Sequence, residues 1–117
     1  MTFESLKNDF ISCIIKRRDV DYGDRASVRR YNYLAQKSWK DGVKINEVYP
    51  DRINDFAELL HHPDWDVKVA CAHSLIVQMN CSETIKMEAV NTIKQYLTIA
   101  EPHEVLGWNW NLKRWGY

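Results

Sequence analysis

The chain has 117 residues, of which 45% are hydrophobic and 27% are charged, a composition typical of one folded domain and not of a disordered chain. Its 16 basic and 16 acidic side chains cancel, so no net charge attracts the protein to nucleic acid or to an anionic membrane. The charges are unevenly placed, however: residues 1–44 hold ten Lys or Arg against six Asp or Glu, whereas residues 45–112 hold four against ten. We therefore expect a basic and an acidic side.

Cysteine usage and the N-terminal sequence indicate a reducing, cytoplasmic location. Cys13, Cys71 and Cys81 cannot all pair with one another, and each lies in or next to an apolar helical pattern, where a thiol packs as a small hydrophobic group. The N-terminus lacks the apolar core of a signal peptide, and the other apolar runs are too short to cross a bilayer.

Two helices are predicted in the first part of the chain. Apolar residues recur at three- and four-residue steps over residues 3–19, which is the period of an amphipathic helix. A second helix follows Gly23 with Asp24 as its N-cap, and we expect Asp41-Gly42 to end it. The inward side of this second helix is predicted to hold Val28, Tyr31, Leu34, Ala35, Ser38 and Trp39.

Two further helices are predicted on either side of a proline turn. Pro50 and Asp51 open a third helix, which ends at residues 61–62 because a residue that precedes a proline is disfavoured in helical geometry. Asp64 is the predicted N-cap of a fourth helix. The buried side of this fourth helix is predicted to include Val67, Cys71 and Leu75.

The last part of the chain predicts a fifth and a sixth helix. Ser82 is the N-cap of the fifth, whose apolar stripe continues toward Ala100, and Pro102 closes it. Residues 103–117 form a short sixth helix with Val105, Trp108, Leu112 and Trp115 on one side. Trp110 falls outside that stripe, and an exposed tryptophan suits the centre of a partner interface.

The segment Phe56–Leu75, FAELLHHPDWDVKVACAHSL, resembles a HEAT-type repeat. It has a first helix ending in paired leucines, a Pro-Asp turn, and a second helix in which Val-Lys is followed by small residues and a leucine. HEAT repeats stack as helix pairs of about 40 residues. With the six predicted helices, this resemblance implies an all-α fold in which residues 1–117 form one domain, a HEAT-like stack of about three antiparallel helix pairs (an α-α superhelix).

The whole chain is similar to an uncharacterised bacterial family of short HEAT-like proteins. The shared features are a charged first helix, a second helix with Tyr31 and Tyr33, the Leu-Leu-x-His-Pro-Asp turn at 59–64 and the closing segment 112–116; the tryptophan-rich tail departs from them. Such members are often similar to immunity proteins encoded beside secreted bacterial toxins. The resemblance therefore implies a cytoplasmic protein-binding module that neutralises a cognate toxin by blocking its active site.

A run of carboxylates is the candidate surface for that partner. Carboxylates recur at three- to four-residue steps along the outside of the predicted third helix and continue into the next turn beside a tryptophan. Like charges at this spacing do not stabilise a helix, so we predict that they dock on a basic toxin domain, for example a nuclease. An ordinary solvated face is the alternative. The candidate partner-binding residues are Glu47, Asp51, Asp55, Glu58, Asp64, Trp65, Asp66 and Trp110.

No motif for catalysis or cofactor binding is recognised. His61, His62 and His73 lie near Asp64 and Asp66 but have no HExxH or CxxC spacing, and adjacent histidines point in different directions on a helix. Cys71 and His73 are two residues apart and face different sides of a helix, so they do not form a nucleophile and base. The glycines stand alone and form no phosphate loop. We expect no enzyme activity, no metal and no cofactor.

Two other functions stay open beside the immunity role. One is a helical-repeat adaptor in a larger assembly. The other is a small nucleic-acid-binding domain that uses the Arg29/Arg30 surface, where arginines alternate with tyrosines that could stack on bases. The simpler interpretation of this basic set is a solvated face with exposed ion pairs to nearby aspartates, so nucleic acid is disfavoured as a partner and no membrane is expected. The basic set is Lys16, Arg17, Arg18, Arg25, Arg29 and Arg30.

Overall fold

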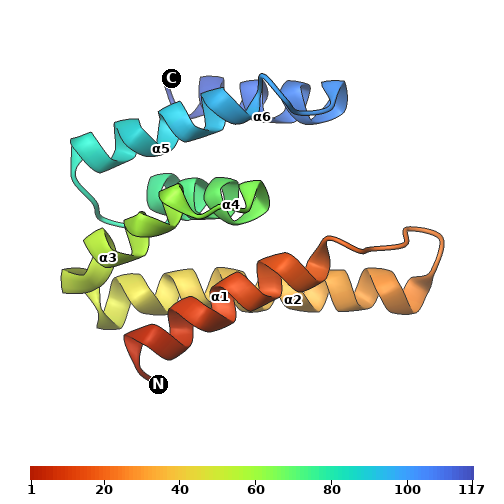
Figure 1. Ribbon diagram of the computed structural model, residues 1–117, viewed down its shortest axis with the longest axis horizontal. Coiled ribbons are helices and arrows are strands. Elements are labelled where there is room, and N and C mark those ends of the chain that lie inside the picture. The colour runs from red at the N-terminus through yellow and green to blue at the C-terminus, as the bar shows by residue number, and fades with distance from the viewer.

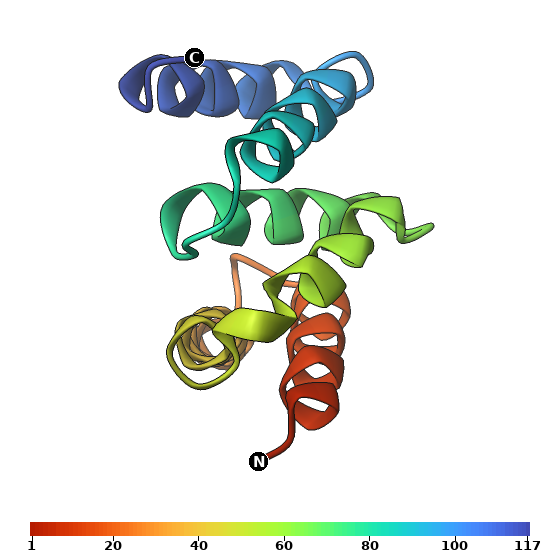
Figure 2. The same cartoon turned by 90° about the vertical axis from the view of Figure 1, so that its left-hand side faces the viewer.

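A computed structural model describes all 117 residues and has six α-helices and no strands. The helices form three layers, in which α1 lies with α2, α3 with α4, and α5 with α6, and the two chain termini lie at opposite ends of the stack (Figure 1, Figure 2). The predicted all-α stack is confirmed. The bounds are α1 Phe3–Arg17, α2 Arg25–Val48, α3 Ile53–Ala57, α4 Trp65–Val77, α5 Glu83–Tyr96 and α6 Pro102–Arg114, with 3-10 turns η1 (Pro50–Arg52) and η2 (Glu58–His61).

One hydrophobic cluster runs through all three layers. Its middle is α4, where Val67, Cys71 and Leu75 are fully buried, as the sequence predicted. Phe10 of α1 meets Phe56 of α3 edge to face, with ring centroids 5.1 Å apart. Edge-to-face pairs of this kind stabilise a core beyond the area that they bury. None of the helices combines the length and the apolar character needed to cross a membrane.

The helix starts follow the predicted caps. The Asp24 side chain accepts a hydrogen bond from the backbone N–H of Ala26, and Ser82 accepts one from Ile85. Asp64 accepts from both Asp66 and Val67. Each cap supplies a partner to backbone donors that the first helical turn leaves free.

The end of α2 differs from the prediction, because the helix passes through Asp41-Gly42 and continues to Val48. Gly42 is a contact point and not a helix stop: a Cβ atom there would lie 2.2 Å from Oε1 of Gln78 at the end of α4. The Gln78 amide donates to the backbone oxygen of Trp39 at 2.8 Å. Fully buried Ile45 then holds the last turns of α2 in the core.

The predicted third helix is broken into short pieces. Only Ile53–Ala57 is α-helical, and the flanking residues form 3-10 turns. The inward side still holds the predicted Ile53, Phe56, Ala57 and Leu60, all of which are buried, and Leu59 is buried with them.

The connection between the last two helices also differs from the prediction. α5 ends at Tyr96, and Pro102 opens α6 instead of closing α5. Proline suits the first turn of a helix because its missing N–H would have had no partner there. Leu112 is the one fully buried residue of α6, and Trp108 and Trp115 are partly buried against the core.

Candidate functional site

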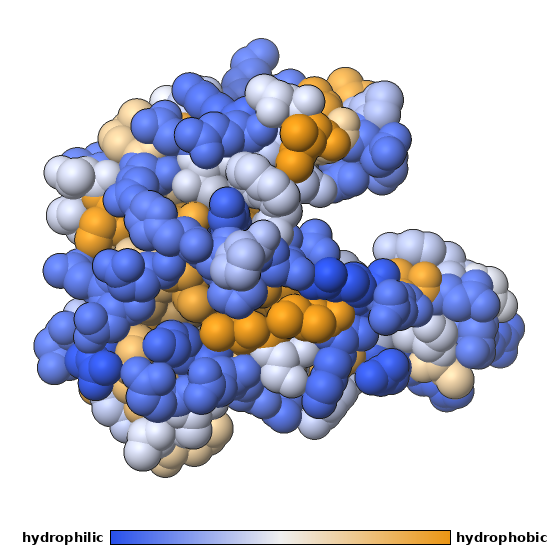
Figure 3. All heavy atoms as spheres, viewed as in Figure 1, coloured by the Kyte–Doolittle hydropathy of each residue, from blue (hydrophilic) through white to orange (hydrophobic).

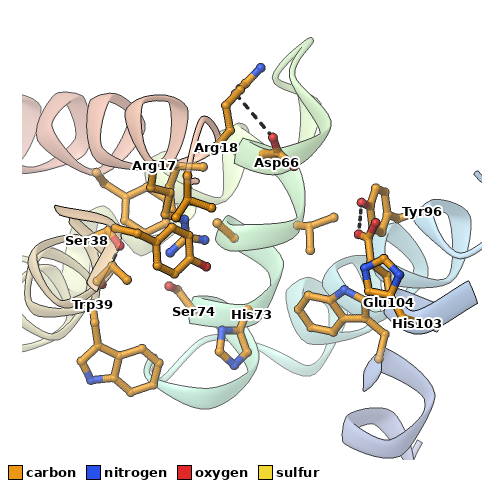
Figure 4. A pocket seen from close by; sticks show the side chains of 18 of the residues that line it. Arg17, Arg18, Ser38, Trp39, Asp66, His73, Ser74, Tyr96, His103 and Glu104 are labelled. Atoms are coloured by element: carbon orange, nitrogen blue, oxygen red, sulfur yellow. Dashed lines mark hydrogen bonds and ion pairs between the residues drawn. The ribbon is translucent and has the colours of Figure 1, made fainter. Parts of the chain in front are cut away.

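An open groove of about 720 Å³ lies between the first layer and the third, with α4 as its floor. Figure 3 shows the surface hollowed between these layers. Figure 4 shows Arg17, Ser38 and Trp39 on one side, His73 and Ser74 in the middle, and Tyr96, His103 and Glu104 on the other. We call this the aromatic groove and define it by Arg17, Tyr31, Trp39, His73, Tyr96 and Trp108.

Aromatic rings from three helices meet at His73. Its imidazole lies 5.8 Å from the ring of Trp39 on α2 and 5.8 Å from that of Trp108 on α6. The Trp115 ring stacks on it at 5.6 Å with an angle of 28° between the planes. These contacts join one residue from the second helix of each layer, because Trp39, His73 and Trp108 lie on α2, α4 and α6.

The charge state of His73 follows from this environment. Burial lowers the pKa of its imidazole, and the nearby positive charge of Arg17 lowers it further. His73 is therefore neutral at pH 7. It can offer one hydrogen-bond donor and one acceptor beside the tryptophans.

The two arginines at the end of α1 have different partners. Arg18 donates to Asp64 and lies 3.6 Å from Oδ2 of Asp66, so both aspartates of the α4 start are already paired. Burial alone would raise the pKa of Asp64, but Arg18 and the backbone N–H groups that Asp64 caps hold it below its usual value. The Arg17 guanidinium lies 5.7 Å from the Tyr31 ring and makes no ion pair. Arg17 is thus the one lysine or arginine of the groove whose charge is not balanced.

A hydrogen bond between Tyr96 and Glu104 closes the far end of the groove. The Tyr96 hydroxyl donates to the Glu104 carboxylate, which links α5 to α6. Burial, followed by this hydrogen bond, raises the pKa of Tyr96 above its usual value. Together these contacts leave a groove with aromatic side chains on both walls, the unpaired guanidinium of Arg17 at one end and the Glu104 carboxylate at the other. The end near Arg17 is suited to binding an apolar group with a carboxylate next to it.

The predicted partner-binding carboxylates differ in their pairing. Four of them follow the chain from the last turn of α2 through η1 and α3 to the start of η2, namely Glu47, Asp51, Asp55 and Glu58, whereas Asp64 and Asp66 pair with Arg18. Asp55 is also paired, with its Oδ2 2.5 Å from Nε of Arg52. The acidic edge that keeps unpaired carboxylates is therefore Glu47, Asp51 and Glu58.

The two predicted tryptophans differ in their surroundings. Trp65 packs against Tyr96 at 5.8 Å and lies under the ammonium group of Lys68 at 4.2 Å. Trp110 is 62% exposed and lies outside the groove, with the Arg114 guanidinium 5.3 Å from its ring. The structure thus brings Trp65 and Asp66 to the groove side and leaves Trp110 on the outer surface of α6.

The basic set and the histidines also have definite places. Arg25, Arg29 and Arg30 are exposed and make no ion pair, so the expected pairing with nearby aspartates is not formed. His61 contacts Glu88 at 3.1 Å, and Nδ1 of His62 accepts from the backbone N–H of Asp64 at 3.0 Å. The histidines therefore do not converge on a shared centre.

Sequence reasoning missed the aromatic groove. The sequence predicts that Trp39 faces inward, yet it is 43% exposed, and it suggests for His73 only a metal ligand or a base beside Cys71. The sequence feature that could have indicated the groove is one large aromatic or imidazole ring near the middle of the second helix of each predicted pair.

Comparisons with protein-family models, curated proteins and solved structures gave no match. The resemblance to HEAT-type repeats stays a prediction.

Proposed function

We propose that this protein is a protein-binding module and that the aromatic groove is its main binding surface. The observation that carries the proposal is the meeting of Trp39, His73 and Trp108, from three successive layers, along one open groove. Stacked helical proteins use extended surfaces of this kind to hold partners. Tryptophan and arginine side chains supply much of the binding energy at interface centres.

The occupant is a segment of another protein that places a carboxylate beside a large apolar side chain. Trp39 and Trp108 offer the apolar walls, and the unpaired guanidinium of Arg17 offers a bidentate partner for a carboxylate. Arg18 is not available in the same way because Asp64 and Asp66 already occupy it.

A finer proposal is that this partner is a bacterial toxin whose active site the protein covers. Its support is the resemblance to immunity-type HEAT-like proteins together with the acidic edge, whose Glu47, Asp51 and Glu58 are exposed and unpaired. Such an edge favours a basic toxin domain and would speed its association. The alternative is that the same groove binds a component of a larger assembly, so that the protein acts as a helical-repeat adaptor.

The toxin proposal is tested by co-expressing the protein with the product of the adjacent gene and measuring the affinity by calorimetry. Trp39→Ala is expected to weaken binding at least about tenfold, since truncating an interface tryptophan costs more than about 1.4 kcal/mol. Trp110→Ala is the matched control, because Trp110 is exposed but outside the groove. Loss of affinity in the Trp110 variant alone would contradict the groove as the binding surface.

A displayed library of random peptides tests the module without assuming a toxin. We expect enriched peptides to carry Asp or Glu next to an aromatic or aliphatic residue and to lose binding to the Trp39→Ala variant. If peptides bind but the product of the adjacent gene does not, the toxin-neutralising function is refuted and the adaptor function is favoured. If the library yields no peptide whose binding depends on Trp39, the proposal that the groove is a protein-binding surface is refuted.

A further inference from the structure

A second cluster of polar side chains lies away from the groove, between α1 and α2. Asp9 and Cys13 are one turn apart on α1, and Asp41 faces them from α2. One potential ligand atom from each residue lies within 4.8 Å of the other two. Cys13 is 3% exposed and Asp41 is 6% exposed, so the cluster is inside the helix pair that Figure 1 shows crossing in the first layer.

Asp41 is the unexplained member of this cluster. Its Oδ2 atom is buried and has no hydrogen-bond partner. A buried carboxylate oxygen without a partner is costly, and the Asp9 carboxylate lies close beside it, so a cation bound between them would satisfy the free oxygen and remove the repulsion.

We propose that Asp9, Cys13 and Asp41 bind one divalent transition-metal ion, with Zn²⁺ as the ion that fits best. Asp9 and Cys13 have the i, i+4 spacing that places two side chains on the same face of a helix. The Cys13 sulfur lies 3.9 Å from Oδ2 of Asp9. Tetrahedral zinc with a thiolate and carboxylates separates its ligand atoms by roughly 3.3–3.8 Å, so a closure of about 1 Å would bring the three protein atoms to the spacing of zinc ligands and leave the fourth position to a water molecule. A thiolate also selects zinc over magnesium or calcium.

Lys37 makes the charge of such a site balance. Its ammonium group lies 3.0 Å from Oδ1 of Asp9, which leaves Oδ2 of the same carboxylate directed at Cys13. Two carboxylates and a thiolate are neutralised by the metal ion together with Lys37. Any proton that the Asp41 carboxyl or the Cys13 thiol carries before the ion binds passes to solvent when it binds.

Bound metal would tie α1 to α2 and stabilise the folded protein. The test uses full-length protein treated with a chelator and then titrated with Zn²⁺ alone, followed by calorimetry and thermal unfolding. We expect one equivalent to bind and the melting temperature to rise by roughly 10 °C when free zinc exceeds the Kd a hundredfold. Co²⁺ in place of zinc is expected to give a thiolate-to-cobalt charge-transfer absorption.

Single substitutions decide whether the three residues form the site. Cys13→Ser and Asp41→Asn are each expected to weaken zinc binding at least tenfold and to abolish or shift the cobalt absorption. Asp41→Asn keeps the shape of the side chain and replaces a carboxylate ligand with an amide, which is a weaker ligand for zinc, so it also reports on binding if the cysteine variant folds poorly. Cys81→Ser is the matched control, because Cys81 is a partly buried free thiol outside the cluster. Absence of zinc binding, or binding that survives both cluster variants, would overturn the proposal.

Discussion

The attachment of α6 provides a sharp test of how the groove is built. Leu112 is 4% exposed and is the only residue of α6 that is fully buried, so Leu112→Ala removes the main apolar contact of this helix. The partly buried Trp108 and Trp115 and the hydrogen bond between Tyr96 and Glu104 are what remain.

The size of the effect follows from this geometry. Truncating a buried leucine costs about 2–5 kcal/mol, whereas complete unfolding of a small domain costs about 5–15 kcal/mol. Because α6 lies at the end of the stack, most of the loss is expected to appear as local opening of this helix. A loss of about 2 kcal/mol would speed amide exchange in α6 about 30-fold.

Hydrogen exchange with mass spectrometry measures this directly. We expect faster exchange across Pro102–Arg114 and little change in α1, α2 and α4. Leu106→Ala is the control on the same helix, since Leu106 is 75% exposed and should change exchange very little. If Leu112→Ala speeds exchange equally in all helices, or leaves α6 unaffected, the account of α6 as a separately attached wall is wrong.

Three further predictions concern stability. Gly107→Ala is expected to stabilise the protein by about 0.5–1 kcal/mol in denaturant titration, because a Cβ there meets nothing within 4 Å and alanine is the better helix former. Asp64→Ala removes the cap of α4 and the partner of Arg18, and we expect a loss of about 1–2 kcal/mol in the same assay. The pKa of His73 is lowered from 6.5 in the folded state, so as the pH falls the unfolded chain binds the proton before the folded protein does. We therefore expect the free energy of unfolding to fall as the pH drops below about 6.5. Thermal melts of the His73→Gln variant should depend less on pH over this range.

Local sequence signals predicted the starts of the helices well. Asp24, Asp64 and Ser82 cap helices because their side chains reach backbone N–H groups two or three residues ahead, and that geometry depends only on nearby residues. The end of α2 could not be predicted in the same way. The Asp41-Gly42 pair alone predicts a helix end, whereas in the fold Gly42 lies inside α2 and leaves room for Gln78, a residue far along the chain.

The candidate site could not be predicted in full, because it depends on distances between helices that the sequence does not give. The carboxylates were correctly placed on exposed segments, but their pairing with Arg18 and Arg52 required knowledge of which helices are neighbours. The meeting of Trp39 with His73 likewise depends on the angle between layers. The cluster of Asp9 and Asp41 forms no sequence motif, because its members lie on two helices that only the fold brings together.

Hydrogen exchange of the protein with and without its bound partner shows whether the partner occupies the aromatic groove. We expect protection at the groove segments, residues 31–39 of α2, 69–74 of α4 and 103–108 of α6. Protection confined to residues 47–58 or to 25–30, with the groove unchanged, would contradict this expectation.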